Sequence, residues 1–234
     1  MVEENEKFNI NLSNSQVMCS GFTVLHFSSV TSTQDIAKMI GKENIVIVAD
    51  EQREGRGRTG NRWFSPLGGI WFTVTLKTDC KLLTLAAGVA AVKALKIQKV
   101  DVKLKWPNDL IYKGKKLGGI IAEKSGELVY LGVGINVGND IPDEIKKIAV
   151  AVGGIQREWF IDSFTNELCT LISLESKEIV KLWRRYDITV GHHVCVNNGK
   201  ETCGIAESVS EDGALVINRD GNRVLIYSGH VRFI

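Results

Sequence analysis

The segment EQREGRGRTGNRWFSP, residues 51–66, contains Gly55-Arg56-Gly57-Arg58-Thr59-Gly60, which matches the pattern G-x-G-x-x-G letter for letter. That pattern marks a dinucleotide-binding fold only between a strand and a helix, because the helix N-terminus then holds the pyrophosphate. A buried-type strand precedes it at residues 44–49, but residues 61–68 lead through a proline into another strand-like segment. The required helix is missing, so the pattern does not indicate a dinucleotide-binding fold.

Hydrophobic periodicity around this loop predicts a mixture of strands and helices. We expect strands at 21–27, 44–49, 69–76, 116–123 and 128–137, with a strand, a turn and a second strand over 104–112. We expect helices at 34–40 and 82–95, and two helical pieces over 157–187 with Trp159, Phe160, Phe164, Leu168, Leu171 and Ile172 on one face.

The sequence pattern changes near Thr189, where short strand-like segments begin to alternate with turn signals such as Asn197-Asn198-Gly199. This spacing is typical of a small β-barrel. The predicted organisation is therefore an N-terminal extension (1–20), a larger domain (21–188) and a β-barrel domain (189–234).

The bulk composition indicates a soluble globular protein. Among 234 residues the formal net charge is +2, which does not indicate a general nucleic-acid or membrane-binding surface. No segment has the length of a transmembrane helix. The five cysteines are scattered and form no C-x-x-C pair, so we expect free thiols, no zinc site and a cytoplasmic location.

The loop at 55–60 combines glycines, which free the backbone, with arginines, whose guanidinium groups match phosphate oxygens. Such a loop is typical of a mobile clamp that orders around an anion, and Trp63 at its end could cover an apolar ligand. An exposed basic turn, including one that contacts RNA, is the alternative.

Two further clusters carry chemistry. In Lys105-Trp106-Pro107-Asn108-Asp109, a lysine beside tryptophan can neutralise a carboxylate or phosphate in a dry site, and Asp109 could hold Mg²⁺ or orient Lys105. A surface lysine before a proline turn is the alternative. Glycines inside the strand-like segments 118–123 and 132–136 suit a flat ligand on the sheet or a bulge, and Asn136 could read the polar edge of a base.

The histidines give no catalytic signal, since neither His26, His192, His193 nor His230 has an Asp or Cys at catalytic or metal-binding spacing. We expect them to have surface or packing roles. An anion clamp, a desolvated lysine and a glycine-lined sheet together suit activation of a carboxylate by ATP, where positioning and charge neutralisation lower the barrier.

In this order the motifs resemble those of the biotin protein ligases (biotin–[acetyl-CoA-carboxylase] ligases), from about Phe22 to the C-terminus. The resemblance implies an α+β fold: a class II synthetase-like catalytic domain with a mixed, largely antiparallel sheet flanked by helices, and a C-terminal SH3-like β-barrel. It is carried by Ser32-Thr33, Gln52, the loop 55–60 with Trp63, Lys105–Asp109, Lys116-Leu-Gly-Gly-Ile and Gly132-x-Gly-Ile-Asn136.

The resemblance also implies a reaction. Biotin and MgATP would form biotinyl-5′-AMP, and a lysine of biotin carboxyl carrier protein would then take the biotinyl group. Lys105 and Arg56 would be catalytic, and Asp109 would hold the metal. Biotin would be bound by Ser32, Thr33, Gln52, Gly55, Arg56, Arg58, Lys105, Gly118, Gly132 and Gly134, and ATP by Arg56, Arg58, Trp63, Lys105, Asn108 and Asn136.

Three positions depart from the family's common pattern: Asn61 for arginine, Gly118 for alanine, and Ala149-Val150-Ala151 for a hydroxyl-bearing segment near the nucleotide. Some members carry an N-terminal DNA-binding winged helix, for which the residues before Phe22 are too few. We therefore expect a ligase that does not bind DNA. The composition predicts no membrane binding, and the resemblance implies a homodimer, since family members are often dimers. A lipoate–protein ligase and a nucleic-acid-binding module are the alternatives.

Overall fold

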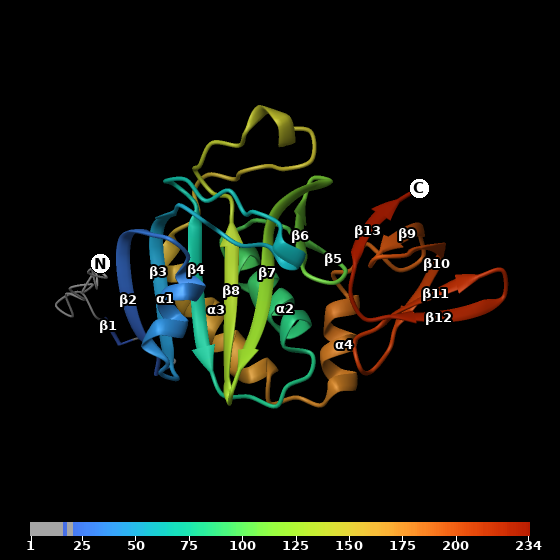
Figure 1. Cartoon of the computed structure of the whole chain (residues 1–234), viewed down its shortest axis with the longest axis horizontal. Helices are drawn as coiled ribbons and strands as arrows, with labels where there is room; N and C mark the ends of the chain where they lie inside the picture. The colour runs from blue at the N-terminus through green and yellow to red at the C-terminus, as the bar shows by residue number, and fades with distance from the viewer. Residues whose placement is uncertain (1–15, 18–20) are drawn as a thin grey trace, which may run out of the picture.

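In the computed structural model, which describes residues 16–17 and 21–234, a large sheet with helices on both faces lies beside a smaller sheet (Figure 1). The predicted N-terminal extension, residues 1–20, lies outside the described residues except for Gln16–Val17, which form the first strand. The predicted domain boundary at 188/189 falls between the two sheets and stays a prediction as a domain limit.

The larger sheet has eight strands in the order β1-β2-β3-β4-β8-β7-β6-β5. Among them β2 and β3 pair in parallel and the other neighbours pair antiparallel, so the prediction of a mixed, largely antiparallel sheet is confirmed. The strands are β1 (Gln16–Val17), β2 (Thr23–Val30), β3 (Ile45–Gln52), β4 (Ile70–Leu76), β5 (Lys103–Lys105), β6 (Asp109–Tyr112), β7 (Lys115–Ser125) and β8 (Leu128–Ile135).

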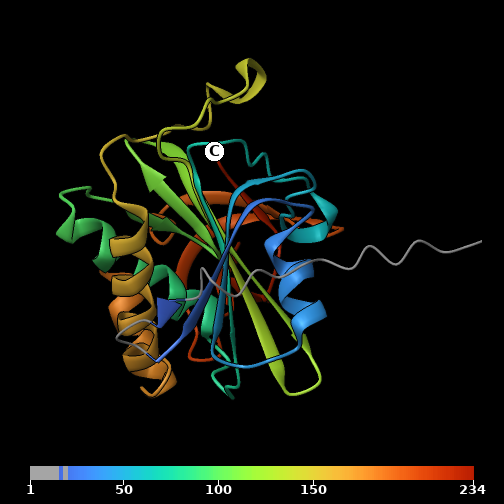
Figure 2. The same ribbon diagram turned by 90° about the vertical axis from the view of Figure 1, so that its left-hand side faces the viewer.

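Helices cover both faces of this sheet. Figure 2 shows α1 on one face and α3 on the other. Ser32 caps α1, because its Oγ accepts a hydrogen bond from the Gln34 N–H (3.3 Å), and Gly41 ends it in the left-handed conformation. The helices are α1 (Thr33–Ile40), α2 (Leu83–Ile97), α3 (Arg157–Leu171) and α4 (Ser176–Arg184), with short 3₁₀ turns η2 (Arg58–Gly60) and η3 (Asp143–Ile145).

The main core lies between the sheet and α2, α3 and α4. Phe72 of β4 meets Phe160 and Phe164 of α3 edge-on, with ring centroids 6.2 and 5.3 Å apart, which is a favourable aromatic geometry. The prediction that Trp159 shares the packed face of this helix is wrong, since the residue is 40 % exposed. It precedes Phe160 directly, so the 100° turn per residue carries it away from the core.

The smaller sheet has five antiparallel strands in the order β12-β11-β10-β9-β13, as expected for an SH3-like domain. Its apolar residues join the main core, and Trp106 ties the two sheets together. The Trp106 N–H donates to Thr189 Oγ1 (2.8 Å) and its Nε1–H donates to the Gly213 carbonyl (3.0 Å). The strands are β9 (His193–Asn197), β10 (Glu201–Val209), β11 (Leu215–Arg219), β12 (Asn222–Ile226) and β13 (His230–Phe233).

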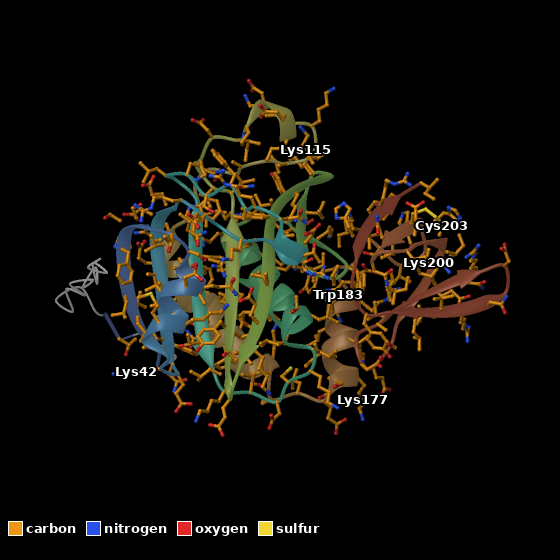
Figure 3. All side chains as sticks on the ribbon, viewed as in Figure 1. Lys42, Lys115, Lys177, Trp183, Lys200 and Cys203 are labelled. Carbon is orange, nitrogen blue, oxygen red and sulfur yellow. A yellow bond between two sulfur atoms is a disulfide. The ribbon has the colours of Figure 1, made fainter. Side chains whose placement is uncertain are left out.

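The expectation that all the cysteines are free thiols is wrong. Cys195 on β9 and Cys203 on β10 are direct cross-strand partners and form a disulfide, with the sulfur atoms visible at Cys203 in Figure 3. Their sequence spacing gave no signal, because the strand register of the hairpin brings them together. Within the described part of the chain, no helix is both long and apolar enough to cross a membrane.

Candidate active site

A cavity of about 650 Å³ opens on the face of the large sheet that carries α1. This volume suits a small-molecule ligand. Its walls come from the N-terminus of α1, the loop 56–64, the central strands β7 and β8, the loop 141–149 and two loops of the smaller sheet. Segments from the whole length of the described chain therefore meet at one site.

One end of the cavity is lined by uncharged polar groups around the start of α1. Gln52 Oε1 accepts hydrogen bonds from the Thr33 N–H (2.8 Å) and Oγ1–H (3.0 Å), and Gln52 Nε2–H donates to Ser65 Oγ (2.9 Å). These bonds fix the side-chain amide of Gln52, and Ser32 beside it is buried. This end is suited to a neutral ligand group that both donates and accepts hydrogen bonds.

A strip of glycines forms the floor of the cavity. Gly119 on β7 and Gly134 on β8 are direct cross-strand partners, and Gly132 pairs with Ile121. A Cβ at Gly134 would lie 2.6 Å from Trp63 Nε1, and one at Gly119 would lie 3.2 Å from Trp63 Cζ3. The indole of Trp63 therefore lies flat on bare backbone, which only glycine permits.

Trp63 leaves one polar atom unsatisfied in this position. Its Nε1 is buried and has no hydrogen-bond partner among the described residues. A buried donor without a partner costs about 1–3 kcal/mol. The indole is therefore held on the strip without a hydrogen bond from Nε1, and a ligand that offers the Nε1–H an acceptor would relieve that cost.

Two glycines predicted to contact the ligand lie elsewhere. Gly118 faces the core, where a Cβ would lie 2.9 Å from Leu110 Cδ1, because alternation along the strand turns it away from Gly119. Gly55 packs inside its loop, where a Cβ would lie 2.4 Å from the Trp63 carbonyl oxygen. Neither lines the cavity, and Gly119 takes the place predicted for Gly118.

Lys116 lies on the floor of the cavity and carries its positive charge there. The sequence analysis did not predict it as a site residue. Its Nζ lies 2.6 Å from Asp109 Oδ1 and 5.1 Å from the centroid of a Trp63 ring. The Lys116 backbone is held as well, since its N–H donates to the Ile148 carbonyl and its carbonyl accepts from the Val150 N–H. The Ala149 segment thus positions Lys116 and lines the cavity beside it.

Lys105, the predicted catalytic residue, pairs with Asp109, which in turn pairs with Gly119, so Lys105 lies on the cavity face of the sheet, two strands away from Gly119. Its Nζ lies 5.3 Å from the centroid of the Phe233 ring. Burial lowers the pKa of Lys105, Asp109 opposes that shift, and Lys116 adds to it. Burial of Lys105 agrees with the inference of a desolvated lysine, and its catalytic role stays a prediction. Lys116 is a second lysine, which lines the cavity itself.

The arginines of the loop differ in their partners. Arg58 Nη1–H donates to Asn108 Oδ1 (3.1 Å) and more weakly to the Gly229 carbonyl (3.4 Å), and burial lowers the pKa of Arg58 while Asp109 opposes the shift. Arg56 is half-exposed and pairs with Asp35 of α1 (2.6 Å). Both line the cavity, Arg58 close to the smaller sheet and Arg56 beside α1.

The remaining predicted contacts also line the cavity. Asn136 is buried, and its Oδ1 accepts from Asn139 Nδ2–H (3.2 Å). Asn108 Nδ2–H donates to the Ile120 carbonyl (2.8 Å). The predicted site residues that line the cavity are Ser32, Thr33, Gln52, Arg56, Arg58, Trp63, Asn108, Asp109, Gly132, Gly134 and Asn136.

The predicted metal ligand Asp109 contributes a single carboxylate to this site. Mg²⁺ commonly binds to one or two carboxylates together with substrate phosphates, so one carboxylate fits only a shared site. Asp109 already pairs with Lys116. Among the described residues, the group that meets the spacing of a three-ligand metal site is Cys195, Glu201 and Cys203, in which the two sulfur atoms are bonded to each other. The role of Asp109 stays a prediction.

Comparison with known proteins agrees with this architecture. The biotin/lipoate A/B protein ligase family pattern matches residues 26–140. The chain is 30 % identical to the bifunctional ligase/repressor BirA of Bacillus subtilis, over 90 % of this chain and 74 % of that protein. It is 29 % identical to the biotin–[acetyl-CoA-carboxylase] ligase of Mycobacterium tuberculosis, over 81 % and 79 %.

A solved structure shares the overall fold. The biotin protein ligase from Aquifex aeolicus, in complex with biotin and ATP, superposes with a TM-score of 0.81 at 26 % identity, covering 90 % of this chain and 98 % of that one. Fold and sequence thus agree. The chain belongs to the biotin/lipoate A/B protein ligase family and is a ligase enzyme.

Proposed function

We propose that this protein activates biotin with ATP as biotinyl-5′-AMP and transfers the biotinyl group to a lysine of biotin carboxyl carrier protein. The observation that carries the proposal is the order of surfaces along one cavity: uncharged polar groups at α1, the glycine strip, then Lys116 and Arg58. The Mycobacterium tuberculosis relative is a biotin–[acetyl-CoA-carboxylase] ligase, and the Aquifex aeolicus structure holds biotin and ATP.

Biotin has a neutral ureido ring at one end and a carboxylate on a flexible chain at the other. The polar pocket of Ser32, Thr33 and Gln52 matches the ring, since its groups both donate and accept. The chain would lie along Gly132 and Gly134, where no side chain intervenes. The carboxylate would then reach Lys116, whose ammonium offsets its charge.

In the first half-reaction a carboxylate oxygen attacks the α-phosphorus of ATP, and the bond to pyrophosphate breaks. Both reactants are anions, so the site must hold them in line and neutralise charge as it develops. Lys116 and Arg58 supply fixed positive charge at the floor and wall of the cavity. Asn136 and Trp63 would hold the nucleoside part, and Mg²⁺ would accompany the phosphates with Asp109 as its protein ligand.

The loop 55–60 would close over the adenylate. Arg56 is half-exposed and paired with Asp35 at the start of α1, so the loop already makes one contact across the cavity. A closed loop keeps water from the mixed anhydride until the carrier lysine arrives. In the second half-reaction the lysine nitrogen attacks the acyl carbon, and the bond from that carbon to the AMP oxygen breaks.

The experiment that tests the proposal measures pyrophosphate release from ATP with biotin or lipoate as the acid. We expect release with biotin, formation of biotinyl-5′-AMP by mass spectrometry, and labelling of a carrier domain but not of its acceptor Lys→Arg variant. Release with lipoate alone would identify a lipoate ligase instead. No release with either acid, together with salt-dependent nucleic-acid binding, would support the nucleic-acid-binding alternative.

Homodimer formation, the absence of DNA binding and a cytoplasmic location stay predictions from the sequence. Size-exclusion chromatography with light scattering tests the first of them directly. A monomer across the working concentration range would contradict it.

A further inference from the structure

His230 begins β13 and is an exposed residue of the smaller sheet on the rim of the cavity. Its neighbour Gly229 accepts the hydrogen bond from Arg58 Nη1 (3.4 Å), so this part of the smaller sheet is tied to the loop that would cover the adenylate. The smaller sheet therefore forms part of the active-site wall and brings an imidazole to it.

The second half-reaction needs a proton acceptor. A lysine side chain has a pKa of about 10.4 and is an ammonium ion near neutral pH, so it must lose a proton before its nitrogen can attack. The ionisable side chains that line the described cavity are three arginines, Lys116, Asp109 and His230. The arginines and Lys116 are already protonated, and Asp109 is paired with Lys116 (2.6 Å).

We infer that His230 is the general base of the transfer step, an inference that rests on the proposed ligase function. One imidazole nitrogen of His230 takes the proton from the lysine ammonium. The neutral lysine nitrogen then forms the amide bond with the acyl carbon and loses its second proton to the phosphate of the departing AMP, while the bond from the acyl carbon to the AMP oxygen breaks. The imidazolium later releases its proton to solvent.

The charges around His230 favour this role. Burial and then Lys105 lower its pKa, Lys116 and Arg58 act in the same direction, and Asp109 opposes them. The imidazole is therefore neutral and able to accept a proton at pH 7 and somewhat below. The same positive charges disfavour a lysine ammonium at the rim and favour its neutral amine. Lys105, beside Phe233 of the same strand, is the largest of these charge effects on the pKa of His230.

The test separates the half-reactions. Wild-type protein is first charged with biotin and ATP to form enzyme-bound adenylate; absence of adenylate would refute the proposed function itself. Single-turnover transfer to a carrier domain is then followed as a function of pH. We expect His230→Gln to form adenylate within a fewfold of the wild-type rate and to transfer about 10²-fold more slowly at pH 7.

The pH profile identifies the base. The rate of transfer by the wild type should fall as the pH drops through the pKa of His230, because a protonated imidazole cannot accept a proton. This pKa lies below the ordinary value of 6.5. His230→Gln should lose this limb and show a rate that rises with pH towards the pKa of the lysine itself. The same limb in the variant would overturn the inference.

Two further measurements distinguish a base from a contact residue. Added imidazole should restore transfer by His230→Ala, and hydroxylamine, an amine already uncharged at neutral pH, should react equally fast with the wild-type and variant adenylates. His193→Gln, on the neighbouring strand β9 and outside the cavity lining, is the matched control and should transfer like the wild type. A raised KM for the carrier with unchanged kcat would show that His230 only contacts the carrier, and would refute the inference.

Discussion

Lys116→Met should nearly abolish adenylate formation. Methionine keeps an unbranched stem beside Trp63 and removes only the ammonium that pairs with Asp109. Two unit charges about 4 Å apart interact by about 4 kcal/mol at the effective dielectric of about 20 that describes sites near a protein surface. Each 1.4 kcal/mol is a factor of ten, so the full charge is equivalent to about 10³ in rate.

The side chain of Lys116 is 34 % exposed, which screens part of that interaction. Loss of Lys116 also leaves the Asp109 carboxylate without this partner, close to where two anions must bind. We therefore expect pyrophosphate release to fall about 10²- to 10³-fold, the range found when one transition-state donor is removed.

The assay is biotin-dependent pyrophosphate release at saturating ATP, with thermal unfolding to establish that each variant is folded. Lys115→Met is the matched control: Lys115 is exposed, donates to the Lys146 carbonyl (2.7 Å), and lies towards the projecting loop in Figure 3. Lys105→Met should lose less activity than Lys116→Met, because Lys105 Nζ lies against Phe233 and its strand is two strands away from Gly119. Near-normal Lys116→Met with inactive Lys105→Met would refute the placement of the catalytic charge.

Three further experiments test the fold around the site. Gly134→Ala should raise the KM for biotin about tenfold or more with little loss of stability. Gly118→Ala should instead lower the free energy of unfolding by about 1–3 kcal/mol, because its Cβ would lie 2.7 Å from a backbone oxygen. Equal shifts in the unfolding temperature of the two variants would contradict the faces assigned to these glycines. Reduction of the Cys195–Cys203 disulfide should lower the free energy of unfolding by about 2.5 kcal/mol, as judged by thermal unfolding with and without dithiothreitol. The stability of Cys203→Ser should not respond to the reductant. A wild-type protein whose stability is unchanged by dithiothreitol would refute the stabilising role of the disulfide. Trp106→Phe removes the bond to Gly213 and should lower the same free energy by about 1–3 kcal/mol in denaturant titrations, so an unchanged midpoint would contradict its role between the sheets.

The sequence predicted the fold well where local signals agree. The missing helix after Gly60 excluded the dinucleotide-binding fold, and a 3₁₀ turn and an extended segment are found there. Strong alternation and turn residues predicted the hairpin of β7 and β8 and the meander of β9 to β13. In these segments propensity, period and turn chemistry all favour the same structure.

The position of Lys116 on the cavity face, which the sequence did not predict, has a specific cause. Simple alternation places Lys116 on the same face as Gly118, which is the core face. The register between β6 and β7 shifts after Leu110–Gly118, and Ile111 pairs with Lys116, so β7 carries one extra residue at Leu117. This bulge returns Lys116 to the cavity face, and no local pattern predicts it.

The other misses have the same origin in long-range pairing. Cys195 and Cys203 meet because β9 and β10 pair in one particular register. His230 reaches the cavity because the smaller sheet docks through Trp106 and Thr189, more than 80 residues apart along the chain. Spacing in the sequence contains no information on either encounter.

The contact between Arg58 and Gly229 joins residues 171 positions apart and lies at the wall of the cavity. During synthesis the eight-stranded sheet can therefore be complete while the ribosome has yet to add β13, and the pocket then lacks one side. A chain that ends before Gly229 would lack this part of the wall, and its anhydride intermediate would be open to hydrolysis.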